Sequence, residues 1–150
     1  MDAHSRRQLL RVGAGLGGWL LLRPAQAGDQ LQDAIHAWTG GAPVATGRVK
    51  LDIAPLVDNG NTVPVSVEVE SPMSAADHVT AIAIFNQRNP RPDVARFTLG
   101  PRAGRAYVGT RIRLATTQQL AAVARMSDGS YWLHTVEVIV TLAACLEEPS

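Results

Sequence analysis

The sequence lacks the features that mark most enzymes and nucleic-acid-binding proteins. It has a single cysteine in 150 residues and a formal net charge of only +1. It contains no Gly-x-Ser-x-Gly elbow, no glycine-rich phosphate loop and no Cys-x-x-Cys pair. These absences argue against a serine hydrolase, a nucleotide-binding enzyme and a dithiol oxidoreductase. The low charge makes nucleic acid a poor candidate ligand.

The first 27 residues have the pattern of an export signal. The arginine pair Arg6 and Arg7 precedes an apolar run over residues 12–22, which is shorter than the roughly 20 residues that a membrane-spanning helix needs. Small residues at Ala25 and Ala27 have the spacing that a signal peptidase accepts. We therefore predict a twin-arginine signal peptide over residues 1–27, cleaved after Ala27. An ordinary secretory signal or an uncleaved anchor is the alternative.

This prediction defines the mature chain and its compartment. Cleavage after Ala27 leaves residues 28–150, with ten basic and twelve acidic residues and a net charge of −2. No other stretch is long and apolar enough to cross a membrane. Because the twin-arginine route exports folded chains, often with a partner aboard, we expect a periplasmic protein that is exported folded together with a partner subunit.

The mature chain reads as one helix followed by short strands. Apolar residues recur at helical spacing from Asp29 to Trp38, and Gly40 and Gly41 can end that helix. The hydrophobic period then changes to two, with turn signals between the runs. Strands are expected near residues 48–53, 63–70, 78–87, 94–99, 105–114, 120–126 and 131–142. About seven such strands predict an all-β, immunoglobulin-like sandwich over residues 28–142, followed by a C-terminal arm over residues 143–150.

The histidines do not suggest a metal centre. His36, His78 and His134 fall on different predicted elements, and none is near the cysteine in the sequence. Metal-binding pairs usually have close spacings, such as two histidines four residues apart. We therefore expect no metal site and no cofactor.

Three arginines are expected on one face of a single strand. Arg105, Arg111 and Arg113 alternate with apolar residues along the run at 105–114. Alternation of this kind places polar residues outward by default, which predicts a solvated outer face. The alternative is a face that contacts an anion or another protein.

The single cysteine, Cys145, lies in the arm. It follows the last predicted strand by Ala143 and Ala144 and is followed by Leu146 and Glu147. Because it has no partner in its own chain and belongs to no core pattern, we interpret it as a chemically used thiol. The alternatives are an incidental thiol and a buried cysteine that acts as a small hydrophobe.

Several motifs of the mature chain resemble the SoxY family, the periplasmic sulfur carriers of bacterial thiosulfate oxidation. They occur in the same order and spacing and cover most of the mature chain. The similar stretches are Asn61-Thr62-Val63-Pro64-Val65, Glu70-Ser71-Pro72-Met73-Ser74-Ala75-Ala76-Asp77, Ile84-Phe85 with Asn89-Pro90, Thr110-Arg111-Ile112-Arg113-Leu114-Ala115 and Ala124-Arg125-Met126-Ser127-Asp128-Gly129-Ser130.

The resemblance implies a carrier rather than an enzyme. It implies a heterodimer with a SoxZ-like subunit, which lacks its own signal and is exported with its partner. It also implies that Cys145 holds sulfur intermediates covalently while separate periplasmic sulfur-oxidising enzymes work on them. A docking or assembly module, whose cysteine is structural or vestigial, is the alternative function.

The arm departs from the pattern of the thiosulfate pathway, where it ends in Gly-Gly-Cys-Gly-Gly. The residues Ala143-Ala144-Cys145-Leu146-Glu147 resemble instead a SoxY-related group with an Ala-Ala-Cys-Ile-Glu arm. Alanine and leucine restrict a backbone that glycine leaves free. Negative charge at Glu147 and Glu148 should raise the pKa of the thiol and repel anions. We therefore expect a different cargo or a different partner enzyme.

Overall fold

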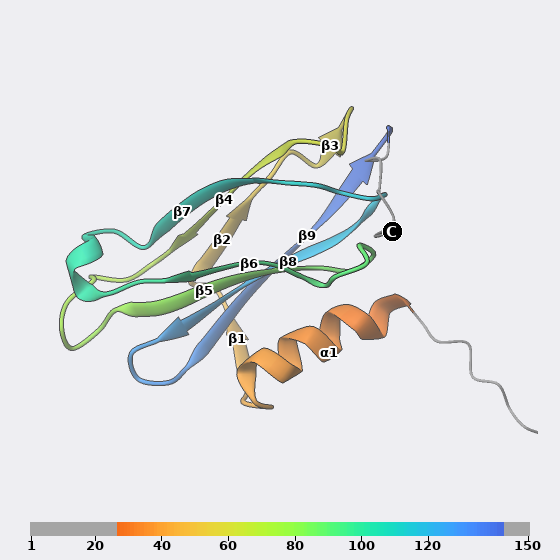
Figure 1. Cartoon of the computed structure of the whole chain (residues 1–150). Coiled ribbons are helices and arrows are strands. Elements are labelled where there is room, and N and C mark those ends of the chain that lie inside the picture. The colour runs from red at the N-terminus through yellow and green to blue at the C-terminus, as the bar shows by residue number, and fades with distance from the viewer. Residues whose placement is uncertain (1–26, 143–150) are drawn as a thin grey trace, which may run out of the picture.

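The structure is a computed structural model that describes residues 27–142 (Figure 1). One helix and a short 3-10 helix accompany nine strands in this range. The elements are α1 (Ala27–Thr39), β1 (Val44–Thr46), β2 (Val49–Asp52), β3 (Leu56–Val57), β4 (Val63–Val69), β5 (Val79–Asn86), β6 (Asp93–Thr98), η1 (Pro101–Ala103), β7 (Tyr107–Ile112), β8 (Gln118–Met126) and β9 (Tyr131–Val140).

The strands form two facing sheets, so the predicted all-β sandwich is confirmed. The larger sheet has the order β1-β9-β8-β5-β6, and β3 adds to β9 at the end of that strand. The smaller sheet has the order β2-β4-β7. The segment from β6 through η1 to β7 crosses from one sheet to the other along one side of the sandwich (Figure 1). As a result, the outermost strands β6 and β7 lie on the same side.

The core between the sheets is formed by the apolar residues of the alternating runs that were predicted from the sequence. Along β4, the valines at 63, 65, 67 and 69 are all buried, while the residues between them are not. Val67 of β4, Ile82 of β5 and Leu120 of β8 are fully buried in the same cluster. Burial of apolar surface of this kind contributes about 25 cal/mol per Å² and is the main stabilising force of the sandwich.

The helix α1 covers the outer face of the larger sheet (Figure 1). Leu31 and Ile35 are buried against a second cluster that includes Phe85 of β5 and Val123 of β8. Trp38 completes the contact, with its ring edge-on to Phe85 at 6.1 Å between ring centroids. The predicted helical spacing is therefore confirmed, and the observed helix extends the predicted one by two residues at its start and one at its end.

All seven predicted strands are present, but two further strands were missed. These are β1 and β3, which have three and two residues. Both pair in parallel with β9. Segments this short are defined by the strand they pair with, so their own sequence carries no periodicity to detect. Within the described range, no helix is long and apolar enough to cross a membrane.

Candidate functional site at the root of the arm

The predicted attachment residue and its neighbours lie outside the described residues. This holds for Ala143, Ala144, Cys145, Leu146 and Glu147, which were predicted as the arm. It holds also for Arg6 and Arg7 of the predicted signal, whereas Ala27 is the first residue of α1. What the structure describes is the platform from which the arm departs, at Thr141 and Leu142.

This platform is held by the turn that follows β3. The N–H of Gly60 donates to the carbonyl of Leu142 at 2.9 Å, and the N–H of Thr141 donates to the carbonyl of Val57 at 3.0 Å. The Thr141 hydroxyl donates to the carbonyl of Asp58 at 3.2 Å. In turn, the carbonyl of Gly60 accepts the N–H of Leu114 at 2.8 Å. The chain is therefore fixed up to its last described residue, three positions before Cys145.

A second support for this end of the sandwich is the side chain of Asn89. Its Nδ2 donates to the carbonyl of Arg113 at 2.8 Å, and its Oδ1 accepts the N–H of Ala115 at 3.0 Å and the Nε2 of Gln118 at 2.8 Å. Its backbone carbonyl accepts the Nε2 of Gln30 in α1 at 3.1 Å. Asn89 thus joins the loops before β6 and after β7 through its side-chain amide, and it joins the helix through its backbone carbonyl.

The β7–β8 loop is also tied directly to the last strand. The N–H of Val140 donates to the Thr117 hydroxyl at 2.9 Å. The loop that Asn89 organises therefore holds β9 close to the point where the arm leaves. Sequence reasoning found the Asn89-Pro90 pair only as a family motif, and it did not identify the Asn89 side chain as a hub.

Exposed apolar side chains gather beside the arm root. Leu56, Ile139 and Leu142 are 57%, 52% and 61% exposed. Leu56 of β3 and Ile139 of β9 are register partners, so they lie side by side, and Leu142 follows three residues later. We call these three residues the apolar patch. Such patches on soluble proteins commonly mark contact sites for other proteins.

A shallow groove of about 960 Å³ runs from the same turn across the outer face of the smaller sheet. Asp58 and Asn59 line its end near the arm root. Ser66 of β4 and Gly109 of β7 form its floor, and Arg111 stands at its side. The small floor residues leave the backbone accessible, and the lining as a whole exposes polar and apolar surface in about equal amounts.

The three arginines predicted on one strand face are all exposed, as expected. Arg105 is paired, because its guanidinium donates to the Glu68 carboxylate at 2.7 and 3.0 Å and lies 5.1 Å from the centroid of the Tyr107 ring. Within residues 27–142, Arg111 and Arg113 make no ion pair.

The three histidines of the described range lie on separate elements and do not form a cluster. His36 is exposed on α1. His78 has its Nδ1 3.0 Å from the carbonyl of Ser74. His134 of β9 accepts the N–H of Leu51 of β2 on its Nδ1 at 2.9 Å. No three His, Cys, Asp or Glu side chains in the described part of the chain are placed to hold a metal ion.

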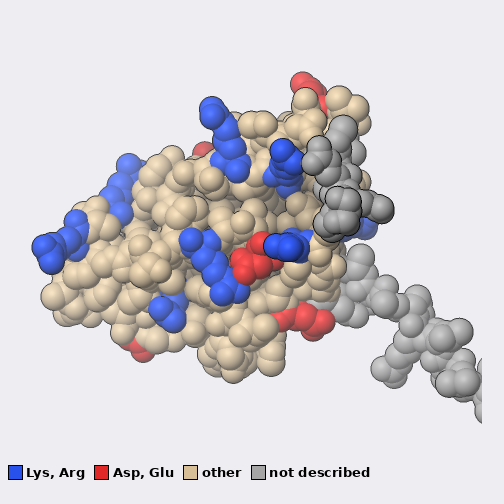
Figure 2. Space-filling model, viewed as in Figure 1, with Lys and Arg blue, Asp and Glu red and all other residues tan. Residues whose placement is uncertain are grey.

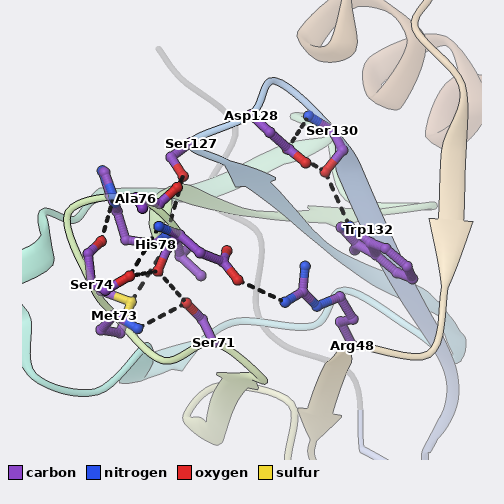
Figure 3. A network of polar contacts seen from close by, with 12 residues as sticks. Arg48, Ser71, Met73, Ser74, Ala76, His78, Ser127, Asp128, Ser130 and Trp132 are labelled. Carbon is purple, nitrogen blue, oxygen red and sulfur yellow. Dashed lines mark hydrogen bonds and ion pairs between the residues drawn. The ribbon is translucent and has the colours of Figure 1, made fainter.

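At the opposite end of β9, a polar network joins two loops (Figure 3). Arg48 pairs with Asp77 at 3.6 Å and lies 5.3 Å from the centroid of the Trp132 ring. The Ser127 hydroxyl accepts the N–H of His78 at 3.1 Å, which fixes the 71–78 loop to the β8–β9 hairpin. The network closes one end of the sandwich and supports the strands.

Two local features of the network stand out. Met73 is the one non-glycine residue with positive φ in the described range, at 49°, and its sulfur accepts the N–H of Val79 at 3.4 Å. In the hairpin, hydrogen bonds from the hydroxyl and the N–H of Ser130 hold the pKa of Asp128 below its ordinary value. Both features stabilise turns rather than form a cavity.

The model of the family described as "Sulfur oxidation protein SoxY" matches residues 35–145. A direct search of curated proteins gave no match.

Among solved structures, the sulfur carrier protein SoxY from Chlorobium limicola f. thiosulfatophilum is similar. It is 31% identical to this chain, covers 76% of this chain and 94% of its own, and has a TM-score of 0.64. A superoxide reductase from Ignicoccus hospitalis has a TM-score of 0.58 at 18% identity over 65% of this chain and 94% of its own. A putative superoxide reductase from Thermotoga maritima has a TM-score of 0.56 at 18% identity over 65% and 93%. At this identity the two reductases share only the fold.

Proposed function

The chain belongs to the SoxY family of sulfur oxidation proteins, and on this premise we propose that it is a covalent sulfur carrier with Cys145 as its attachment atom. The observation that carries the proposal is the end of β9, which is fixed by hydrogen bonds up to Leu142 and leads within three residues to the only thiol of the chain. The family match also runs as far as Cys145.

The geometry at the root suits a carrier. Three residues of extended chain span at most about 11 Å, so the position of Cys145 stays within that distance of the rigid platform. A cargo on this thiol is presented to an enzyme at a defined place on the surface. The groove beside the root is open, with a mixed polar and apolar lining, and it does not enclose a substrate. We therefore propose a substrate-bearing partner of enzymes, which is not itself an enzyme.

Loading of Cys145 has a route that needs no separate oxidant. The Cys145 thiolate attacks the terminal sulfur of a polysulfide, a new S–S bond forms, and the neighbouring S–S bond of the polysulfide breaks. The electron pair of the broken bond leaves with the shortened polysulfide, as in thiol–disulfide exchange. The product is a persulfide on Cys145, from which an enzyme can take up the outer sulfur.

The apolar patch supports a permanent partner. Leu56, Ile139 and Leu142 are exposed apolar side chains near the arm root, and the first two lie side by side. Permanent interfaces are more apolar than transient ones. We propose that a SoxZ-like subunit covers this patch and that the pair is exported folded to the periplasm by the twin-arginine route, directed by Arg6 and Arg7.

The bulkier, acidic arm supports a variant cargo or partner enzyme. Leu146 and Glu147 replace the glycines of the thiosulfate-pathway arm, so an enzyme channel shaped for glycines would not accept them without change. We propose that the carried species is a less anionic form of sulfur than thiosulfate, or that a different enzyme receives the arm.

The experiment that tests the function is intact mass spectrometry of the mature protein purified from its periplasm without reductant. The carrier account expects sulfur-containing additions that localise to Cys145 and disappear on reduction. The Cys145→Ser variant should lose every such addition while it keeps its fold and its partner. Additions that persist in this variant would contradict the proposal.

A further inference from the structure

The charges of the described chain are separated between two regions of the sequence. Residues 88–113 hold seven arginines and one acidic residue, Asp93, for a net charge of +6. The remainder of the described chain holds three basic and nine acidic residues, for a net charge of −6. The near-zero total therefore conceals one segment of concentrated positive charge.

The fold gathers the basic segment on one side. Residues 88–113 comprise the loop before β6, then β6, η1 and β7. β6 is an outermost strand of the larger sheet and β7 of the smaller one, and the two lie on the same side of the sandwich. All seven arginines are exposed: Arg88, Arg91, Arg96, Arg102, Arg105, Arg111 and Arg113. Figure 2 looks onto this side, and blue side chains are spread over it with few red ones between them. We call it the arginine side.

Most of these arginines are not neutralised by the described residues. Arg96 pairs with Asp93 and Arg105 with Glu68. Within residues 27–142, the other five arginines of this side make no ion pair. A guanidinium offers several fixed donors that match a carboxylate in two parallel hydrogen bonds, and arginine is enriched at protein interfaces.

The arginine side reaches the root of the arm. The carbonyl of Arg113 accepts the side-chain N–H of Asn89 at 2.8 Å, and the next residue, Leu114, donates to Gly60, which holds Leu142. A protein seated on this side would therefore have the arm leaving at the margin of its contact surface. The apolar patch lies at β3 and β9, whereas β6 and β7 are the far strands of the two sheets.

We propose that the arginine side is the docking surface for a carboxylate-rich partner, namely the enzyme that works on the arm. This rests on the proposed carrier function. The choice of the enzyme over the permanent subunit follows from the chemistry of the two surfaces. An apolar patch suits a lasting contact, while charge complementarity mainly raises the association rate and permits rapid release, as successive enzymes require.

A simpler explanation of the same arginines is that they protect the unpaired edges of the outermost strands. Charged side chains on outermost strands prevent edge-to-edge pairing between molecules. That role requires no partner and predicts only aggregation when the charges are removed. The two readings therefore differ in whether loading of Cys145 responds to the arginines.

The test compares two charge-matched double variants of the mature chain. Arg111→Glu/Arg113→Glu reverses two charges on the arginine side, and Lys50→Glu/Arg125→Glu reverses two exposed charges on β2 and β8. Each is mixed with a periplasmic extract of the source organism and polysulfide, and the growth of Cys145 adducts is followed by intact mass at about 20 mM and 200 mM salt. The rate in heat-inactivated extract, which measures direct attack of Cys145 on polysulfide, is subtracted to give the enzyme-dependent rate. Circular dichroism and size-exclusion chromatography confirm that both variants are folded and soluble.

The inference expects slower enzyme-dependent loading of the arginine-side variant alone, by about tenfold at low salt, because electrostatic steering changes association rates by about 10- to 1,000-fold. The deficit should shrink at the higher salt, where the Debye length falls below about 8 Å. Wild-type rates for this variant, or an equal loss in the matched control, would overturn the inference.

If the wild-type protein is never loaded, the carrier function is contradicted. A second measurement then tests the docking surface independently of loading. A deca-glutamate peptide is titrated into the labelled mature chain and amide chemical shifts are followed by NMR. The inference expects shifts confined to residues 88–113 that vanish in the arginine-side variant. Shifts spread evenly over the molecule, or none, would overturn it.

Discussion

The hydrogen bond between His134 and Leu51 is a single contact whose loss should be measurable. His134 lies on β9 and Leu51 on β2, so the bond joins the two sheets of the sandwich. Its length is 2.9 Å, and Leu51 is only 3% exposed. The Nδ1 of His134 is the acceptor, which leaves the ring proton on Nε2 in the neutral form.

Replacing His134 by leucine removes the acceptor and keeps an apolar side chain in its place. The N–H of Leu51 then stays buried without a partner, which costs about 1–3 kcal/mol. We expect the free energy of unfolding to fall by about 2 kcal/mol, with a melting temperature lower by roughly 8 °C for a domain of this size. His134→Asn should recover most of this loss, because Oδ1 of asparagine can occupy a position close to that of Nδ1.

The assay is urea unfolding of the mature chain, followed by tryptophan fluorescence. The leucine variant should shift the midpoint with an unchanged m-value, which indicates a change in stability rather than in the unfolded state. His36→Leu, on the exposed side of α1, is the matched control and should stay within about 0.5 kcal/mol of wild type. A leucine variant as stable as wild type, or an asparagine variant no better than leucine, would refute the reasoning.

Three further predictions concern the arm root, the hairpin and the thiol. Asn89→Ala should lower the free energy of unfolding by about 2–3 kcal/mol in the same urea assay, because it leaves the buried amide of Gln118 short of an acceptor; a change below 0.5 kcal/mol would contradict the hub. Asp128→Asn should remove an acid-dependent contribution, since the lowered pKa of Asp128 stabilises the fold at pH values above its ordinary pKa near 3.9 and that gain is lost as the pH falls through the lowered value. The difference in the free energy of unfolding between the two proteins should shrink as the pH falls below about 4, and a constant difference would count against it. Glu147→Gln/Glu148→Gln should raise the rate of Cys145 alkylation by iodoacetamide at pH 7 about two- to threefold, because removal of negative charge lowers the thiol pKa; an unchanged rate would show that the carboxylates do not act on the thiol.

The strands of the core could be predicted because alternation is a local signal. In β4 every second residue is buried, so the period of two appears directly in the sequence. Several alternating runs, with turn residues between them, were enough to predict a sandwich. The helix was predictable for the same reason, since Leu31 and Ile35 face the sheet at a spacing of four.

What could not be predicted depends on residues that are distant in the sequence. The hydrogen bond between Leu51 and His134 joins positions 83 residues apart. The hydrogen bond between Gly60 and Leu142 depends on β3, a two-residue strand that is defined only by its pairing with β9. The role of Asn89 as a hub follows from four contacts in three other segments. The arginine side was visible only in part. Three of its members belong to one predicted strand at 105–114, of which only Arg111 lies within β7, and the others come from the loop before β6, from β6 and from η1.

The most direct test of the account is the intact mass of the mature protein, purified without reductant from the periplasm of cells that are oxidising sulfur. The account predicts mass additions in multiples of a sulfur atom, or of a small sulfur-containing group, that localise to Cys145 and vanish on reduction. An unmodified mass that stays unchanged after incubation with sulfide, polysulfide and thiosulfate in a periplasmic extract would contradict the carrier function and favour a docking module.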